Sequence, residues 1–113
     1  MGNRRIDKEA CGYTPTLDAL VVALCRHYDR RATAVESERV TPRTGMEYKY
    51  LNYRIYEGAA EIVGERYASL YIDEIGKKTG YAATAHDAVS ERVYKEEKQE
   101  VKINVARKLH LLD

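Results

Sequence analysis

The sequence predicts an all-α protein with three main helices, the second of them long and central, packed as a homo-oligomer. Two observations support this fold class. Apolar residues recur at intervals of three and four along most of the chain, and its only two prolines each follow a threonine just before a helix-compatible segment. The 113 residues form a single domain by size, and residues 1–13 are expected to be a flexible N-terminus.

The first helix is predicted from about Thr16 to Glu38, directly after the first proline. It contains the segment CRHYDRR, the densest cluster of reactive residue types in the chain. Cys25 shares a helix face with Asp29 while His27 points away, which disfavours a Cys/His nucleophile pair on this helix. A structural role is therefore expected for the cluster, and both cysteines are expected to be thiols.

The second helix is predicted to begin after Thr41, its N-cap, and to run for about thirty residues. Residues 46–50 also alternate like a strand, but helical spacing explains more of the positions. One apolar stripe consists of Tyr48, Leu51, Ile55, Ala59 and Ile62. The stripe moves after Gly64, so the helix must bend there or change partners. Lys77 and Lys78, between Gly76 and Gly80, indicate its end.

Four tyrosines lie close together in this helix, at positions 48, 50, 53 and 56, in a chain without Phe or Trp. Three interpretations are considered: the rings form a surface on which bases stack, they line one face of a strand, or they pack a helix against its neighbours. Stacking on nucleic acid would require basic residues on the same exposed face. Because the rings spread over more than half of the helix circumference, packing at helix contacts, and at a subunit boundary, is the favoured interpretation.

The third helix is predicted from Ser90 to the C-terminus, although residues 101–105 also alternate like a strand. On the helical interpretation Ile103 lies on the polar side, where an exposed isoleucine suits contact with a second subunit. The subunit-interface candidates are Tyr53, Tyr56, Gly64 and Ile103.

Several function classes lack the residues they require. The sequence contains no CxxC, ExxH or HExxH spacing, so no cofactor or metal is expected, and the formal net charge of +1 gives no overall attraction to polyanions. No apolar run is long enough for a membrane span, so a cytoplasmic protein is expected. An enzyme, with Cys25 or His86 as the reactive group, is the third-ranked class, and no small-molecule substrate is evident.

The segment IGKKTGYAATAHDAVSERV, residues 75–93, resembles a helix-turn-helix DNA-binding unit. Gly80 matches the turn, but His86 stands where that family buries an aliphatic residue, which disfavours the packing of its two helices. The resemblance implies DNA contacts by Lys77, Lys78, Thr84, Ser90 and Arg92. An ordinary helix junction is the favoured alternative.

Two longer segments, MEYKYLNYRIYEGAAEIVGE and EVKINVARKLHLLD, resemble small proteins of bacterial prophages and other mobile elements. This resemblance implies an accessory protein and supplies no catalytic signature. The function expected first is therefore a non-enzymatic interaction or assembly protein that acts through helix faces. The alternative is a helix-turn-helix DNA-binding regulator.

Overall fold

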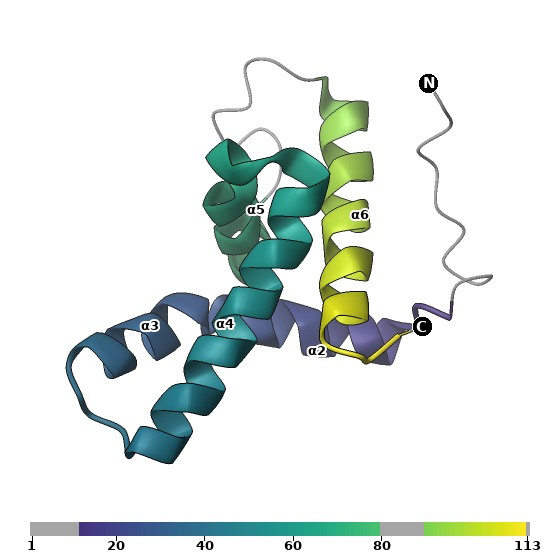
Figure 1. Cartoon of the computed structure of the whole chain (residues 1–113). Coiled ribbons are helices and arrows are strands. Elements are labelled where there is room, and N and C mark those ends of the chain that lie inside the picture. Colours follow the sequence, from purple (N-terminus) through teal and green to yellow (C-terminus); the bar gives the residue numbers. More distant parts are fainter. Residues whose placement is uncertain (1–11, 80–89, 113) are drawn as a thin grey trace.

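The computed structural model describes residues 12–79 and 90–112. Within these residues it is all-α, with five helical segments and no strand (Figure 1). The segments are α2 (Pro15–Arg26), α3 (Tyr28–Glu36), α4 (Pro42–Val63), α5 (Glu65–Lys77) and α6 (Glu91–Lys108). The all-α prediction is confirmed within these residues, but each of the first two predicted helices is divided into two, and the homo-oligomer stays a prediction.

Both predicted helix starts are confirmed, because a threonine caps each one. The Thr14 hydroxyl accepts a hydrogen bond from the Leu17 backbone N–H at 3.2 Å. The Thr41 hydroxyl accepts one from the Thr44 backbone N–H, also at 3.2 Å. A proline follows each cap and occupies the first turn of the helix. Backbone N–H groups in the first turn have no carbonyl partner within the helix, so the missing N–H of proline costs no hydrogen bond there.

The two divisions occur at His27 and Gly64. Gly64 has φ 85° and ψ 161°, a conformation that only glycine adopts readily, and α5 then runs back beside α4 (Figure 1). The bend predicted near Gly64 is therefore confirmed. His27 separates α2 from α3 by a single residue, and no sequence signal predicted that break.

Both segments for which a strand was the alternative are helical. Residues 46–50 lie in α4 and residues 101–105 lie in α6. The predicted apolar stripe of α4 also holds at its centre, because Ile55 and Ala59 are fully buried.

The expected exposure of Ile103 is wrong. Its side chain is 0% exposed. The side of α6 that faces away from α4 is covered by residues near the N-terminal end of α2. Tyr13 is buried there, its hydroxyl donates to Asp18 at 2.9 Å, and Lys102 of α6 pairs with Asp18 at 2.7 Å. Tyr13 is therefore packed, and the prediction of a flexible N-terminus otherwise concerns residues 1–11, which lie outside the described range.

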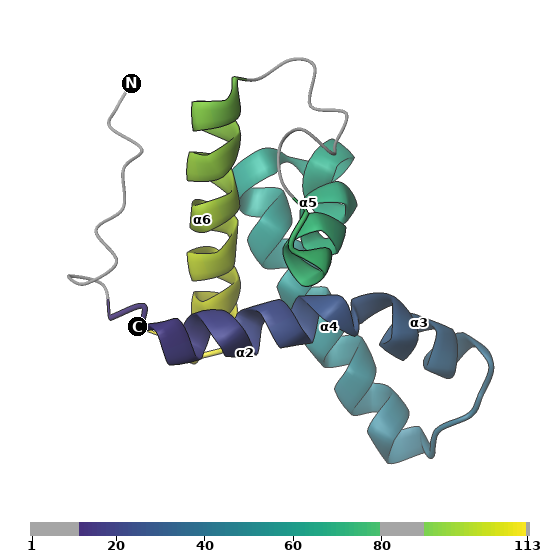
Figure 2. The same ribbon diagram turned by 180° about the vertical axis from the view of Figure 1, so that it is seen from behind.

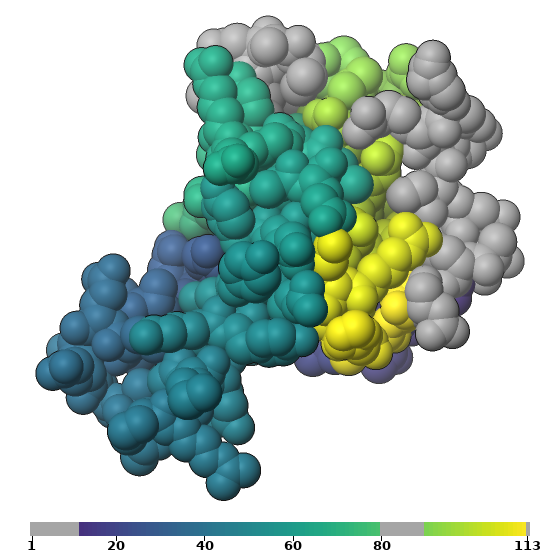
Figure 3. All heavy atoms as spheres, viewed as in Figure 1, coloured from purple at the N-terminus to yellow at the C-terminus, as the bar shows by residue number. Residues whose placement is uncertain are grey.

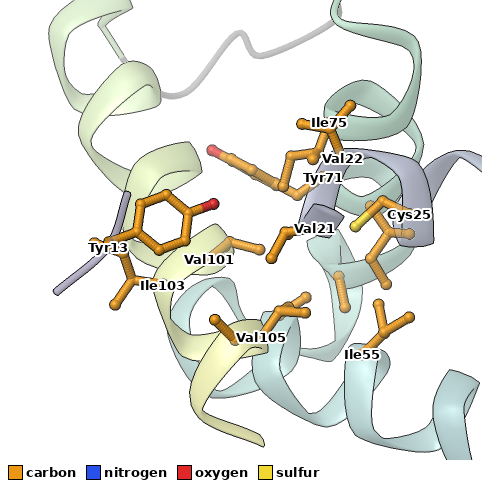
Figure 4. Packing of buried hydrophobic residues seen from close by; sticks show 14 of the residues in the cluster. Tyr13, Val21, Val22, Cys25, Ile55, Tyr71, Ile75, Val101, Ile103 and Val105 are labelled. Carbon is orange, nitrogen blue, oxygen red and sulfur yellow. The ribbon is translucent and has the colours of Figure 1, made fainter. Parts of the chain in front are cut away.

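The core lies where α2 crosses the upright group formed by α4, α5 and α6 (Figures 2 and 4). Its buried members include Val21 of α2, Ile55 of α4 and Val105 of α6. Two glycines allow close approach of helix backbones. A Cβ on Gly58 would lie 2.9 Å from Val105 Cα, and one on Gly76 would lie 2.6 Å from Arg26 Cα. These contacts pack α4 on α6 and α5 on α2.

Candidate functional site

The α3 helix and the N-terminal two thirds of α4, within residues 28–56, form an arm that projects from the rest of the molecule (Figures 1 and 3). The α3 helix packs mainly on α4. It ends at Ser37, after which Glu38 has a left-handed φ of 55° and the Arg39 N–H donates to the Ala34 carbonyl at 3.0 Å. This closing motif turns the chain back toward α4.

One side of α4 on the arm is exposed and apolar. Met46, Tyr50 and Tyr53 are 71%, 51% and 61% exposed, whereas the other exposed large hydrophobic side chains of residues 12–79 and 90–112, Leu20 and Leu111, stand elsewhere. The three residues follow the i, i+4, i+7 spacing of a single helix face. Tyr50 and Tyr53 therefore do not pack at helix contacts within one chain, and their place at a subunit boundary stays a prediction.

Charged residues flank this stripe on the same face. We define the α4 face as those of residues 42–57 of α4 that lie within about 60° of Tyr50 at 100° per residue. Its members are Arg43, Met46, Glu47, Tyr50, Tyr53, Arg54 and Glu57. Arg54 pairs with Glu57 at 2.7 Å and lies 5.4 Å from the centre of the Tyr50 ring, and Arg43 approaches Glu47 at 4.0 Å. Hydrogen bonds to Tyr50 and Glu57 raise the pKa of Arg54.

The other predicted interface residues occupy different surroundings. Tyr56 is half-buried and lines a groove of about 390 Å³ between α3 and α4. The groove is lined by Tyr28, Ala32, Val35, Glu36, Tyr48, Lys49, Asn52, Tyr53 and Tyr56. Gly64 is exposed at the α4–α5 break, with no atom near the position of an added Cβ. Of the four candidates, Tyr53 alone lies on the α4 face.

A second hollow, of about 750 Å³, lies on another side of the arm, and we name it the arginine pocket. Its lining is rich in cations and has a smaller apolar part. The lining residues are His27, Asp29, Arg30, Arg31, Thr33, Ala34, Arg39, Val40, Tyr48 and Leu51. The sequence did not predict this pocket, because only the tertiary structure brings Arg39 and Leu51 close to α3.

Arg31 is the buried member of this pocket, with 7% of its surface exposed. Its Nε donates to Asn52 Oδ1 at 2.7 Å and its Nη2 donates to the Leu24 carbonyl at 2.6 Å. Asn52 Nδ2 in turn donates to the Tyr28 carbonyl at 3.0 Å. Burial lowers the pKa of Arg31, yet a guanidinium remains charged at neutral pH. These bonds join α2, α3 and α4 where the arm begins.

Cys25, one of the two reactive groups considered for an enzyme, is buried with 3% exposure and is a free thiol. Burial raises its pKa to about 12. The thiolate is the nucleophilic form of cysteine, so at neutral pH this residue lacks the ionisation that nucleophilic catalysis requires.

Of the residues expected to contact DNA, Ser90 and Arg92 lie at the N-terminal end of α6. Ser90 has extended backbone angles, φ −75° and ψ 162°, and its hydroxyl accepts from the Val93 N–H at 3.2 Å, so it caps α6. Ser90 and Arg92 therefore belong to the start of α6, and their expected contact with DNA stays a prediction. Thr84 and His86 lie outside the described residues.

At the end of α5, Lys77 and Lys78 are both exposed. Lys77 pairs with Asp73 at 3.2 Å. Lys78 takes the left-handed cap, with φ 58°, in the place where a glycine was expected. The predicted end of this helix is confirmed, although Lys78 and not a glycine adopts the left-handed backbone conformation there.

A buried polar cluster between α5 and α6 was not predicted. The Tyr94 hydroxyl donates to Glu74 Oε1 and the Tyr71 hydroxyl donates to Glu97 Oε1, each at 3.0 Å. Glu74 is 2% exposed, and burial raises the pKa of both tyrosines. The sequence signal that could have indicated this cluster is the position of Glu74 within the apolar stripe of α5. Since each hydroxyl has a carboxylate acceptor, the cluster holds the two helices together.

Comparisons with known proteins give no relative. No protein-family model, curated protein or solved structure matches the chain. Residues 12–79 and 90–112 include no helix of the length and apolarity needed to span a membrane, and no group of three or more His, Cys, Asp or Glu side chains placed to hold a metal ion.

Proposed function

We propose that this protein is a non-enzymatic assembly protein that pairs with a second copy of itself through the α4 face. It would thereby serve as an accessory protein of the kind that the prophage resemblance implies. The observation that carries the proposal is the exposed stripe of Met46, Tyr50 and Tyr53. Aromatic and methionine side chains are enriched in the buried centres of protein interfaces, and tyrosine is among the residues whose loss costs most binding energy there.

The charges of the α4 face favour a second copy as the partner. Along the helix they run positive at Arg43, negative at Glu47, positive at Arg54 and negative at Glu57. In an antiparallel pair that crosses at Tyr50, Arg43 of one copy meets Glu57 of the other. Glu47 likewise meets Arg54. A two-fold axis at Tyr50 thus places opposite charges together on both sides of the apolar stripe.

The expected affinity is modest. Full burial of a large apolar side chain contributes roughly 1.5–3 kcal/mol, and the pair would bury six such side chains in part. Association costs about 4–15 kcal/mol in lost translational and rotational freedom. The net gain is therefore small, and we expect a weak dimer that forms only at high protein concentration.

Sedimentation velocity over a wide concentration range tests this function. The Tyr50→Ser/Tyr53→Ser variant is expected to weaken self-association by about tenfold or more, because it removes two apolar contacts from each copy. Leu20→Ser is the matched control, since Leu20 is also exposed, at 41%, but stands on α2. A monomer at every concentration, or equal weakening by both variants, would exclude the α4 face as a self-association surface.

DNA binding through residues 75–93 is the alternative function. The cap at Ser90 does not favour it, because the groove-facing residues would then be divided between two helices. The assembly function therefore has the stronger support from the described residues.

A further inference from the structure

We propose that the arginine pocket is a binding site for an organic phosphate with a planar body, of the size of a nucleoside monophosphate. This site goes beyond the assembly function and does not depend on it. The α4 residues that line the pocket, Tyr48 and Leu51, lie on the helix side turned away from Tyr50.

Arg31 is a buried cation without an anionic partner among the described residues. Both of its hydrogen bonds go to neutral oxygens, of Asn52 and Leu24, and within residues 12–79 and 90–112 no carboxylate pairs with it. Buried guanidinium groups normally have an anionic partner, because desolvating an unpaired charge is costly. An anion in the pocket would supply the missing countercharge.

The guanidinium also has free donors. Arg31 Nη1 makes no hydrogen bond within the described part of the chain, and it is not among the buried polar side-chain atoms that lack a partner there. The two N–H groups of Nη1 therefore reach an accessible surface, and the hollow that Arg31 lines is the arginine pocket. Arginine presents such groups in a planar fork that matches two oxygens of a phosphate.

Two further arginines stand at the same hollow. Arg30 neighbours Arg31 on α3, and Arg39 is held near Ala34 by the motif that closes α3. Neither forms an ion pair with a residue that the structure describes, and both are exposed. Asp29 is the single carboxylate in the lining, so the arginines outnumber it three to one. The local potential is positive although the whole chain carries only +1.

The rest of the lining indicates an organic part. A phosphate group alone occupies a small share of a 750 Å³ hollow, and sites for small organic ligands have volumes of about 300–1,000 Å³. Tyr48 offers an aromatic ring for a planar group, and Val40 and Leu51 offer aliphatic contacts. The groove on the other side of α3 has Lys49 and Glu36 as its only charged lining residues, so its charge is balanced and it does not favour an anion.

Isothermal titration calorimetry with five probes tests the proposal: the four common nucleoside monophosphates and inorganic pyrophosphate. At least one monophosphate is expected to bind more tightly than pyrophosphate, and its nucleoside is expected not to bind. Arg30→Gln and Arg39→Gln should each weaken the binding by about tenfold, since each removes charged donors from an exposed position. Arg107→Gln, an exposed arginine of α6, is the matched control and should leave the affinity unchanged.

Three results would overturn the proposal. One is the absence of binding by all five probes at about 10 mM. Another is equal weakening by Arg107→Gln, which would reduce the binding to general attraction by charge. The third is equal affinity for pyrophosphate and all the monophosphates, which would refute the organic part. Self-association of Arg30→Gln should match that of the natural chain, so failure here remains distinguishable from failure of the assembly function.

Discussion

At the scale of single residues, Gly76 and Gly45 show why position in the fold decides what a glycine does. Gly76 was a signal for a helix end, but it also allows α5 to contact α2, and its carbonyl accepts from Arg26 Nε at 3.2 Å. Arg26 is fifty positions away in the sequence, so spacing along the chain was unable to predict this contact. Gly45 lies in the first turns of α4, where an added Cβ would meet only Val40 Cγ2, at 3.6 Å.

We expect opposite effects when each glycine is replaced by alanine. Gly76→Ala should lower the free energy of unfolding by about 1–3 kcal/mol, because its Cβ would lie 2.6 Å from Arg26 Cα and the helices must separate. Gly45→Ala should raise it by about 0.5–1 kcal/mol, because alanine favours helix and the space is open. Urea denaturation measures both changes. A Gly76→Ala variant at least as stable as the natural chain would contradict the packing described for α5 on α2.

At the scale of helices, features that depend on neighbouring residues were predicted correctly. The burial of side chains was predicted less well. The helix start after Pro15, the cap at Thr41 and the change of direction near Gly64 were predicted because each depends on residues within one turn. The burial of Ile103 was not predicted, because a helical wheel assumes one covered side. In the fold α6 is covered by α4 and also by α2, which a single periodicity does not indicate.

The start of α6 provides a prediction that distinguishes a cap from a helix interior. Ser90→Ala should lower the free energy of unfolding by about 0.5–2 kcal/mol, because the Val93 N–H loses its acceptor. Ser90→Asp retains an acceptor and should restore most of the loss. Alanine inside a continuous helix would instead stabilise it slightly. Greater stability of Ser90→Ala in urea denaturation would therefore support a recognition helix that passes through Ser90.

At the scale of the whole molecule, the arm determines which residues are accessible. The sequence predicted a subunit interface at Tyr53 but included neither Met46 nor Tyr50, since tyrosines spread around a helix were expected to pack. Their exposure follows from the projection of the arm away from α5 and α6, which depends on contacts distant in sequence (Figure 3). The arginine pocket was beyond prediction for the same reason, because it joins α3, the following loop and α4.

Cysteine cross-linking tests the central claim, the antiparallel pairing of two α4 faces, most directly. In a Cys11→Ser background, Tyr50→Cys places a thiol at the proposed two-fold axis, while Cys25 stays buried and protonated with a pKa of about 12. Mild oxidation should give a disulfide-linked dimer of Tyr50→Cys at protein concentrations where the natural chain self-associates, because the disulfide traps even a pair weakened by loss of the ring. The control Arg107→Cys should give little dimer, because only residue 50 meets its own copy within disulfide distance. Absence of a Tyr50→Cys dimer, or equal dimer from both variants, would contradict the pairing.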